Sequence, residues 1–219
     1  SKVKKGILRD ELLALSGLSS GGGFTETLDE LLASEFIRGK IVVLEVKHGA
    51  YFTNQGIPVA TMLRDALTRS DWQERSVSII IESFDLSMLI ELRRRCGDLA
   101  KYLLLTEASR IPAAPDQVIK SFMQDLATHA HGLSIDLDLL FRDSLDAKSD
   151  SSSLGLASAQ SHWVRMAKEQ GLELHTWTAK AEDATGSVEQ YFAEIIETGV
   201  DGIFADQPDL LRPVVDGLA

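Results

Sequence analysis

The sequence has very little cysteine and no long apolar run. Its one cysteine, Cys96, cannot form an intramolecular disulfide, so an oxidising compartment is not required. The longest apolar stretches, such as residues 77–81, fall far short of the roughly 20 residues that cross a bilayer. The basic residues 1–5 lead into an amphipathic pattern and not into the apolar core of a signal peptide. We therefore expect a cytoplasmic protein that does not span a membrane; the alternative is an exported protein whose signal has been removed, because its mature chain would have the same features.

Positive charge is also scarce. The chain has 22 Lys and Arg against 33 Asp and Glu, which gives a formal net charge of −11 and a pI near 4.9. A chain this acidic repels a phosphate backbone, so nucleic acid would have to bind at a local basic patch. Residues 2–9 offer such a patch, but acidic side chains follow on the helix expected after it. We expect no nucleic-acid partner, and a helix-turn-helix DNA-binding module is the weakest alternative.

What the chain does have is a regular alternation of segment types. With 44% hydrophobic residues, it can bury one sizeable core. From Gly39 onward, short β-branched runs alternate with longer segments of helical period, which is typical of βα units and a parallel sheet. Strands are expected at residues 41–46, 77–83, 102–106, 133–137, 172–178 and 202–205. Helices are expected at residues 58–69, 86–95, 115–130, 155–170, 186–198 and 208–217. Residues 39–219 are thus predicted to form one α/β domain.

Residues 1–38 differ in character from the rest. Two short helical patterns flank a link rich in glycine and serine at residues 16–23. This order is typical of a helix-turn-helix, and simple packing of two amphipathic helices explains it as well. We expect residues 1–38 to form a separate segment that packs on the α/β domain.

Polar and aromatic residues stand where several expected strands end. Glu45 and Lys47 point to the same side of the first strand. A carboxylate at position 45 is either a ligand for a hard cation or half of an ion pair with Lys47. Trp177 either lines a cleft or fills the core, and Asp85 fits the cap of the helix that follows it. The ends of the strands are therefore the predicted location of a functional site.

Four motifs at these strand ends resemble a known family. They are LEVK at residues 44–47, ESFD at residues 82–85, HTWT at residues 175–178 and GVDGIFADQPD at residues 199–209. Their order and intervals are similar to the third, fourth, seventh and eighth strands of the glycerophosphodiester phosphodiesterases. The resemblance spans about residues 24–219. It implies a TIM-barrel-like (β/α) parallel barrel that is incomplete, with about six βα units.

The resemblance also implies an activity and a site. The activity is the metal-dependent hydrolysis of glycerophosphodiesters to glycerol 3-phosphate and an alcohol. The matching residues imply that Glu45 helps to bind a divalent metal, Mg²⁺ or Ca²⁺, and that Lys47 contacts the substrate phosphate. They also imply that Trp177 lines the substrate cleft. Glu82 lies where the family often places a polar group near the substrate.

The catalytic motifs of that family are missing from this chain. The family carries two catalytic histidines in a His-Arg-Gly and a His-Asp motif and two more metal ligands in a Glu-x-Asp pair, and the sequence contains none of them. Proton transfer by such groups typically contributes about 10²–10⁴-fold, and one carboxylate holds a hard cation poorly. We assign no catalytic residue and expect the chain to be inactive as a hydrolase. The histidines left without a catalytic role are His48, His129, His131, His162 and His175.

A second resemblance concerns the beginning of the chain. Residues 2–37 are similar to the winged-helix segment of certain prokaryotic ATPases, and this similarity overlaps the first one near residues 24–37. Such an overlap is what a recombination would leave, so a non-enzymatic recombined or engineered scaffold is the alternative function. A sheet meant to close around eight strands but supplied with about six has two open edges. We therefore predict self-association through those edges.

Overall fold

The structure is a computed structural model that describes residues 27–111, 114–142 and 161–218. Six strands form one parallel sheet and follow one another across it in chain order. They are β1 (Ile41–Glu45), β2 (Ser78–Ser83), β3 (Lys101–Thr106), β4 (Gly132–Asp136), β5 (Glu173–Ala179) and β6 (Gly202–Ala205). Doubly wound sheets reverse their strand order at a switch point, whereas (β/α) barrels keep it sequential. The predicted TIM-barrel-like fold is confirmed.

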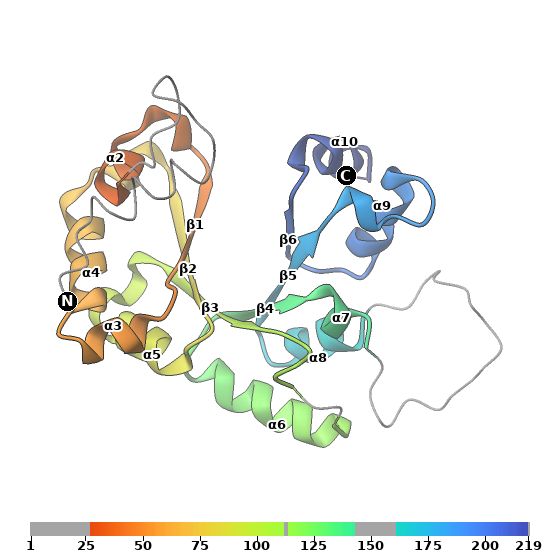
Figure 1. Cartoon of the computed structure of the whole chain (residues 1–219), viewed down its shortest axis with the longest axis horizontal. Coiled ribbons are helices and arrows are strands. Elements are labelled where there is room, and N and C mark those ends of the chain that lie inside the picture. Colours follow the sequence, from red (N-terminus) through yellow and green to blue (C-terminus); the bar gives the residue numbers. More distant parts are fainter. Residues whose placement is uncertain (1–26, 112–113, 143–160, 219) are drawn as a thin grey trace.

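Helices cover the outer face of this sheet. Figure 1 shows the sheet curling into an open arc, with β1 and β6 at its two ends. The longer helices are α4 (Val59–Arg69), α5 (Leu86–Cys96), α6 (Asp116–Ala127), α8 (His162–Glu169), α9 (Val188–Glu197) and α10 (Pro208–Leu218). The shorter elements are α2 (Leu28–Ala33), α3 (Gly49–Asn54), α7 (Leu137–Leu140), η1 (Glu35–Ile37), η2 (Trp72–Arg75), η3 (Gly97–Leu99) and η4 (Ala181–Asp183). The described part of the chain therefore forms a half-barrel.

The core lies between the sheet and the helices. Ile79 and Ile81 of β2 are buried in one apolar cluster with helix residues such as Leu89 and Leu92 of α5. Fully burying a leucine of this kind contributes about 1.5–3 kcal/mol. Because side chains alternate along a strand, the residues between the core positions face the concave side of the arc. The concave side is therefore where polar strand residues such as Glu82 lie.

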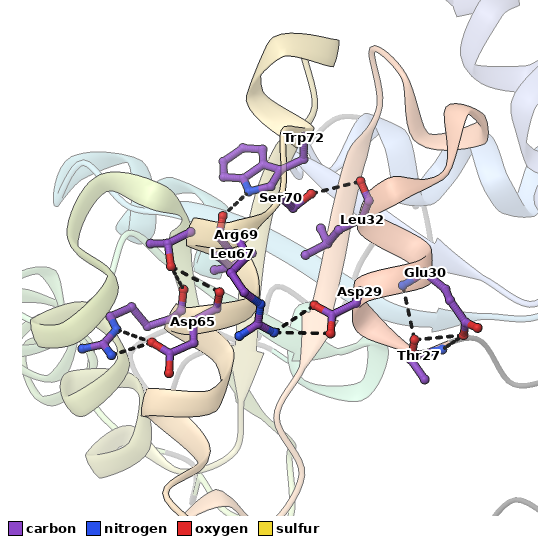
Figure 2. Close-up of polar contacts among 11 residues, drawn as sticks. Thr27, Asp29, Glu30, Leu32, Asp65, Leu67, Arg69, Ser70 and Trp72 are labelled. Atoms are coloured by element: carbon purple, nitrogen blue, oxygen red, sulfur yellow. Dashed lines mark hydrogen bonds and ion pairs between the residues drawn. The ribbon is translucent and has the colours of Figure 1, made fainter.

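Polar contacts fasten α2 to α4 and η2. A capping box between Thr27 and Glu30 begins the helix, and Arg69 of α4 donates a hydrogen bond of 3.1 Å to Asp29 (Figure 2). Arg75 is buried and donates to the last two carbonyl oxygens of α2, those of residues 32 and 33. This guanidinium satisfies carbonyl groups that have no partner within the helix. Residues 1–26 of the predicted helix-turn-helix lie outside the described residues.

The predicted strands agree with the observed ones to within one residue at each end. Helix α3 was not predicted. It begins after His48, which adopts a left-handed conformation with φ of 53°. Gly49 follows, and a Cβ there would lie 2.6 Å from Cγ of Met88, so only glycine allows α3 to pack against α5. No helix in the described ranges is long and apolar enough to cross a membrane.

Candidate functional site

A cavity of about 410 Å³ lies at the carboxyl-terminal ends of the strands. The four residues selected from the sequence, Glu45, Lys47, Glu82 and Trp177, all line it. They come from β1, from the residues just after β1, from β2 and from β5, so the curl of the sheet brings together positions far apart in the chain. In barrels of this type the sites occupy this end of the strands.

Glu45 and Lys47 form an ion pair across the mouth of the cavity. Lys47 Nζ lies 2.7 Å from Glu45 Oε2, and the side chain of Lys47 is 70% exposed. Exposed pairs of this kind contribute less than about 1 kcal/mol, so the ammonium group can exchange its partner for a ligand anion at little cost. The sequence allowed two roles for Glu45, as half of an ion pair with Lys47 or as a ligand for a cation. The structure forms the ion pair, and a carboxylate in such a pair retains the oxygen atoms that a cation needs.

Glu82 has the most perturbed environment in the cavity. It is 3% exposed and stands next to Glu45 in the parallel register of β1 and β2. Its Oε1 atom is buried and has no hydrogen-bond partner among the described residues. The pKa of Glu82 is raised from 4.5 to about 7, mainly by burial; the hydroxyl of Ser134 lowers it and the charge of Glu45 adds a smaller increase. Glu82 is therefore largely a neutral acid in mildly acidic solution.

A histidine that the sequence reasoning passed over lies beside this carboxyl group. His175 is buried, and its Nδ1 lies 4.0 Å from Glu82 Oε1. Its ring needs Gly202 on the neighbouring strand, because a Cβ there would come within 2.9 Å of the imidazole. Burial lowers the pKa of His175, so the ring is held in its neutral form. The alternation of β5 placed His175 on the same face as Trp177, and only the curl of the sheet brings it to Glu82.

Aromatic side chains form one wall of the cavity. Trp177 is half-buried and its indole N–H donates a 3.0 Å hydrogen bond to the carbonyl oxygen of Ser134. Phe84 meets it edge to face at 5.8 Å, and Phe204 also lines the cavity. The guanidinium of Arg110 lies 4.9 Å above the Phe84 ring. The cavity therefore combines a charged mouth with an apolar wall.

The other sequence predictions have plain outcomes. Asp85 is the N-cap of α5, as expected, and accepts a 3.0 Å hydrogen bond from the backbone N–H of Ser87. None of the five histidines lines the cavity, although His175 lies next to Glu82. Among the described residues, no group of three or more His, Cys, Asp or Glu side chains could hold a metal ion. The oxygen ligands present at this mouth are the two carboxylates of Glu45 and Glu82.

A parallel half-barrel with a charged cavity at the strand ends defines the chain as a protein of the (β/α)-barrel class. The model of the glycerophosphoryl diester phosphodiesterase family matches residues 15–210. The chain belongs to that family, and the resemblance read from its motifs is confirmed. The match begins inside residues 1–38. That this segment was joined to the barrel by recombination stays a prediction.

Known proteins support the fold. A search of curated proteins found no match. Fourteen chains of known structure match. One is the crystal structure of a candidate glycerophosphoryl diester phosphodiesterase from Silicibacter pomeroyi DSS-3, with 22% identity and a TM-score of 0.56. The alignment covers 87% of this chain and 56% of that one, so the chain spans just over half the length of the protein it matches. At this identity the likeness shows the fold.

Proposed function

We propose that the cavity at the strand ends binds glycerophosphodiesters. The observation that carries this proposal is the convergence of Glu45, Lys47, Glu82 and Trp177, which were selected from four separate sequence positions, on one cavity of a family member. In this proposal Lys47 contacts the phosphate. Trp177 packs against the carbon atoms of the ligand, and Glu82 hydrogen-bonds to one of its polar groups.

The electrostatics of the mouth favour this arrangement. Lys47 is exposed and only weakly held by Glu45, so its three N–H donors are available to a phosphate oxygen. A charge-assisted hydrogen bond of this kind contributes about 1.5–3 kcal/mol. Glu82, in its neutral form, has a proton to donate and an unpartnered oxygen to accept with. A ligand hydroxyl group could accept this proton and donate its own to the unpartnered oxygen.

A divalent cation fits the same mouth if the ligand itself helps to hold it. The buried, unpartnered Oε1 of Glu82 beside Glu45 is the feature that favours a cation here. Ca²⁺ takes about six to eight oxygen ligands, whereas Mg²⁺ is commonly held by one or two carboxylates together with phosphate and water. The two side chains therefore suit Mg²⁺ better than Ca²⁺, and a bound cation would hold Glu82 in its ionised form, replacing the hydrogen bond to a ligand hydroxyl. When bound, the cation would polarise the phosphate.

We propose binding without ordinary turnover for the chain as given. The sequence contains no His-Arg-Gly, His-Asp or Glu-x-Asp motif, and His175 does not line the cavity. Without proton-transfer groups, the rate would fall by a factor on the order of 10²–10⁴. Release of glycerol 3-phosphate should therefore stay far below the roughly 1–10³ per second of typical enzymes. Metal-dependent release at such ordinary rates would contradict this part of the proposal.

Binding can be tested through the tryptophans. Trp72 and Trp163 are buried, while Trp177 is half-buried in the cavity wall, so a ligand there should change the fluorescence of Trp177. Glycerophosphocholine titrated with Mg²⁺ present should give a saturable change, and Lys47→Ala should weaken the affinity at least about tenfold. Lys40→Ala, at an exposed lysine before the opposite end of β1, is the control and should bind normally. Equal affinities in the two variants, or no binding at all, would favour the non-enzymatic scaffold.

We also propose that the chain self-associates through its sheet edges. In the described part of the chain, β1 and β6 each pair with one neighbour, which leaves one edge of each strand without a ladder. Apolar side chains are exposed at the start of β1 and in η1 just before it, with Ile41 66% exposed and Phe36 77% exposed. Unprotected edges of this kind readily pair with another chain.

A further inference from the structure

A second cavity, of about 680 Å³, adjoins the first. It lies between the end of β1 and the helices α2, α3 and α4, and it shares Glu45 and Lys47 with the cavity at the strand ends. The two cavities therefore meet at the ion pair where the proposed function places the phosphate. A phosphodiester has two substituents on its phosphate, and two adjoining cavities offer a place for each.

The second cavity is mainly apolar. Its lining includes Val46, Phe52, Ile57, Val59 and Met62. Met62 is 48% exposed, although the next residue on α4 is buried in the core. The volume of the second cavity lies within the range of cavities that hold small molecules, and such cavities are lined mostly by apolar side chains. An apolar group that entered this cavity would leave water and contact a surface that is otherwise solvated.

The polar rim of the second cavity restricts the charge of its ligand. Two cations line the cavity, Lys47 and Arg69. Arg69 is paired with Asp29 across the gap between α4 and α2 (Figure 2), and Lys47 is paired with Glu45. Asp65, labelled in Figure 2, also lines the second cavity and is paired with Arg64. Only the exposed Lys47 stands at the junction with the first cavity, so the rim suits one anionic phosphate and an uncharged remainder.

We propose that the alcohol moiety of the bound phosphodiester carries a hydrocarbon chain, and that this chain lies in the second cavity while the phosphate lies at Lys47. The inference rests on the proposed function and adds the class of substrate: glycerophosphodiesters of an apolar alcohol. Each methylene group that leaves water should strengthen binding roughly fourfold. The gain should end when the cavity is full.

A series of alkyl esters of glycerol 3-phosphate, from methyl to octyl, tests the proposal by isothermal titration calorimetry below the concentrations at which the esters form micelles. Affinity should rise with chain length and then level off. Met62→Glu places a charge in the second cavity at an exposed position and should remove most of this rise, while the methyl ester binds as before. Val118→Glu is the control, because Val118 of α6 is 56% exposed and lines neither cavity, so it should keep the full rise.

The outcomes distinguish failure of this inference from failure of the proposed function, the binding of glycerophosphodiesters. Binding of the methyl ester shows that the variant is folded and that the first cavity accepts a glycerophosphodiester. If the methyl ester binds and the longer esters bind no more tightly, the hydrocarbon chain does not use the second cavity and the inference fails alone. An equal rise in wild type and Met62→Glu would overturn it as well. If no ester binds the wild type, the proposed function itself fails and the inference falls with it.

Discussion

Substituting Glu82 by glutamine should make the folded chain more stable in alkaline solution and leave it nearly unchanged in acid. Glu82 is 3% exposed, and burial raises its pKa from 4.5 to about 7. The folded state holds the proton of Glu82 more tightly than the unfolded state does. The resulting contribution to the free energy of unfolding is therefore fully present below pH 4.5. It is lost as the pH rises through about 7. Glutamine has the shape of the protonated acid and carries no charge to desolvate.

The size of the effect follows from the two pKa values. Each unit of difference between the folded and unfolded states corresponds to about 1.4 kcal/mol, so ionised Glu82 costs the folded state about 3 kcal/mol above pH 8. For a chain of this length, that is roughly 6–12 °C in melting temperature. His175 has the opposite pH dependence, since burial lowers its pKa, but it is present in both proteins. The comparison of variant with wild type therefore isolates Glu82.

The assay is urea unfolding of wild type and Glu82→Gln at pH 5 and pH 8. Because pH 5 already lies above the unfolded pKa of 4.5, the stability difference between the two proteins should grow by roughly 2.5 kcal/mol between these pH values. Glu74→Gln, at an exposed glutamate, is the control and should change stability by less than about 0.5 kcal/mol at either pH. A Glu82→Gln difference that does not change with pH would refute the reasoning. Glu82 would then be solvated, and its surroundings in the cavity would differ from those described.

Two further predictions concern stability and assembly. Arg75→Ala should destabilise the chain by about 2–4 kcal/mol in urea unfolding, because the buried guanidinium bonds two carbonyl oxygens of α2 and pairs with Asp71 at 2.9 Å. The exposed Arg38→Ala should cost less than about 1 kcal/mol, and equal losses would contradict the role of Arg75. Sedimentation velocity should show self-association that Ile41→Lys reduces, since lysine protects sheet edges; a wild type that stays monomeric at high concentration would remove this prediction.

Much of the fold was predictable because short strand patterns alternate with segments of helical period along the chain. Residues 79–81 are three isoleucines between polar neighbours, and the shortness of this run together with its β-branched side chains indicates a buried strand. Helix α3 was not predictable, because residues 49–54 have no helical period. It depends on the left-handed turn at His48 and the space that Gly49 leaves for Met88.

The location of the candidate site was predictable, and its energetics were not. Strand-end motifs placed Glu45, Lys47, Glu82 and Trp177 in one cavity, as the structure has them. The burial of Glu82 and its approach to His175 depend on how tightly the sheet curls, which no local pattern records. The second cavity depends on the distance between α2 and α4. Contacts such as the ion pair of Arg69 with Asp29 set this distance, and they join residues far apart in the chain.

The location of a bound ligand tests the central claim most directly. A crystal structure of the chain with glycerol 3-phosphate and Mg²⁺ should show the phosphate within hydrogen-bond distance of Lys47 Nζ and the glycerol carbons against Trp177. Glycerol 3-phosphate bound elsewhere on the molecule, with the ion pair of Glu45 and Lys47 intact and the cavity filled by water alone, would contradict the account.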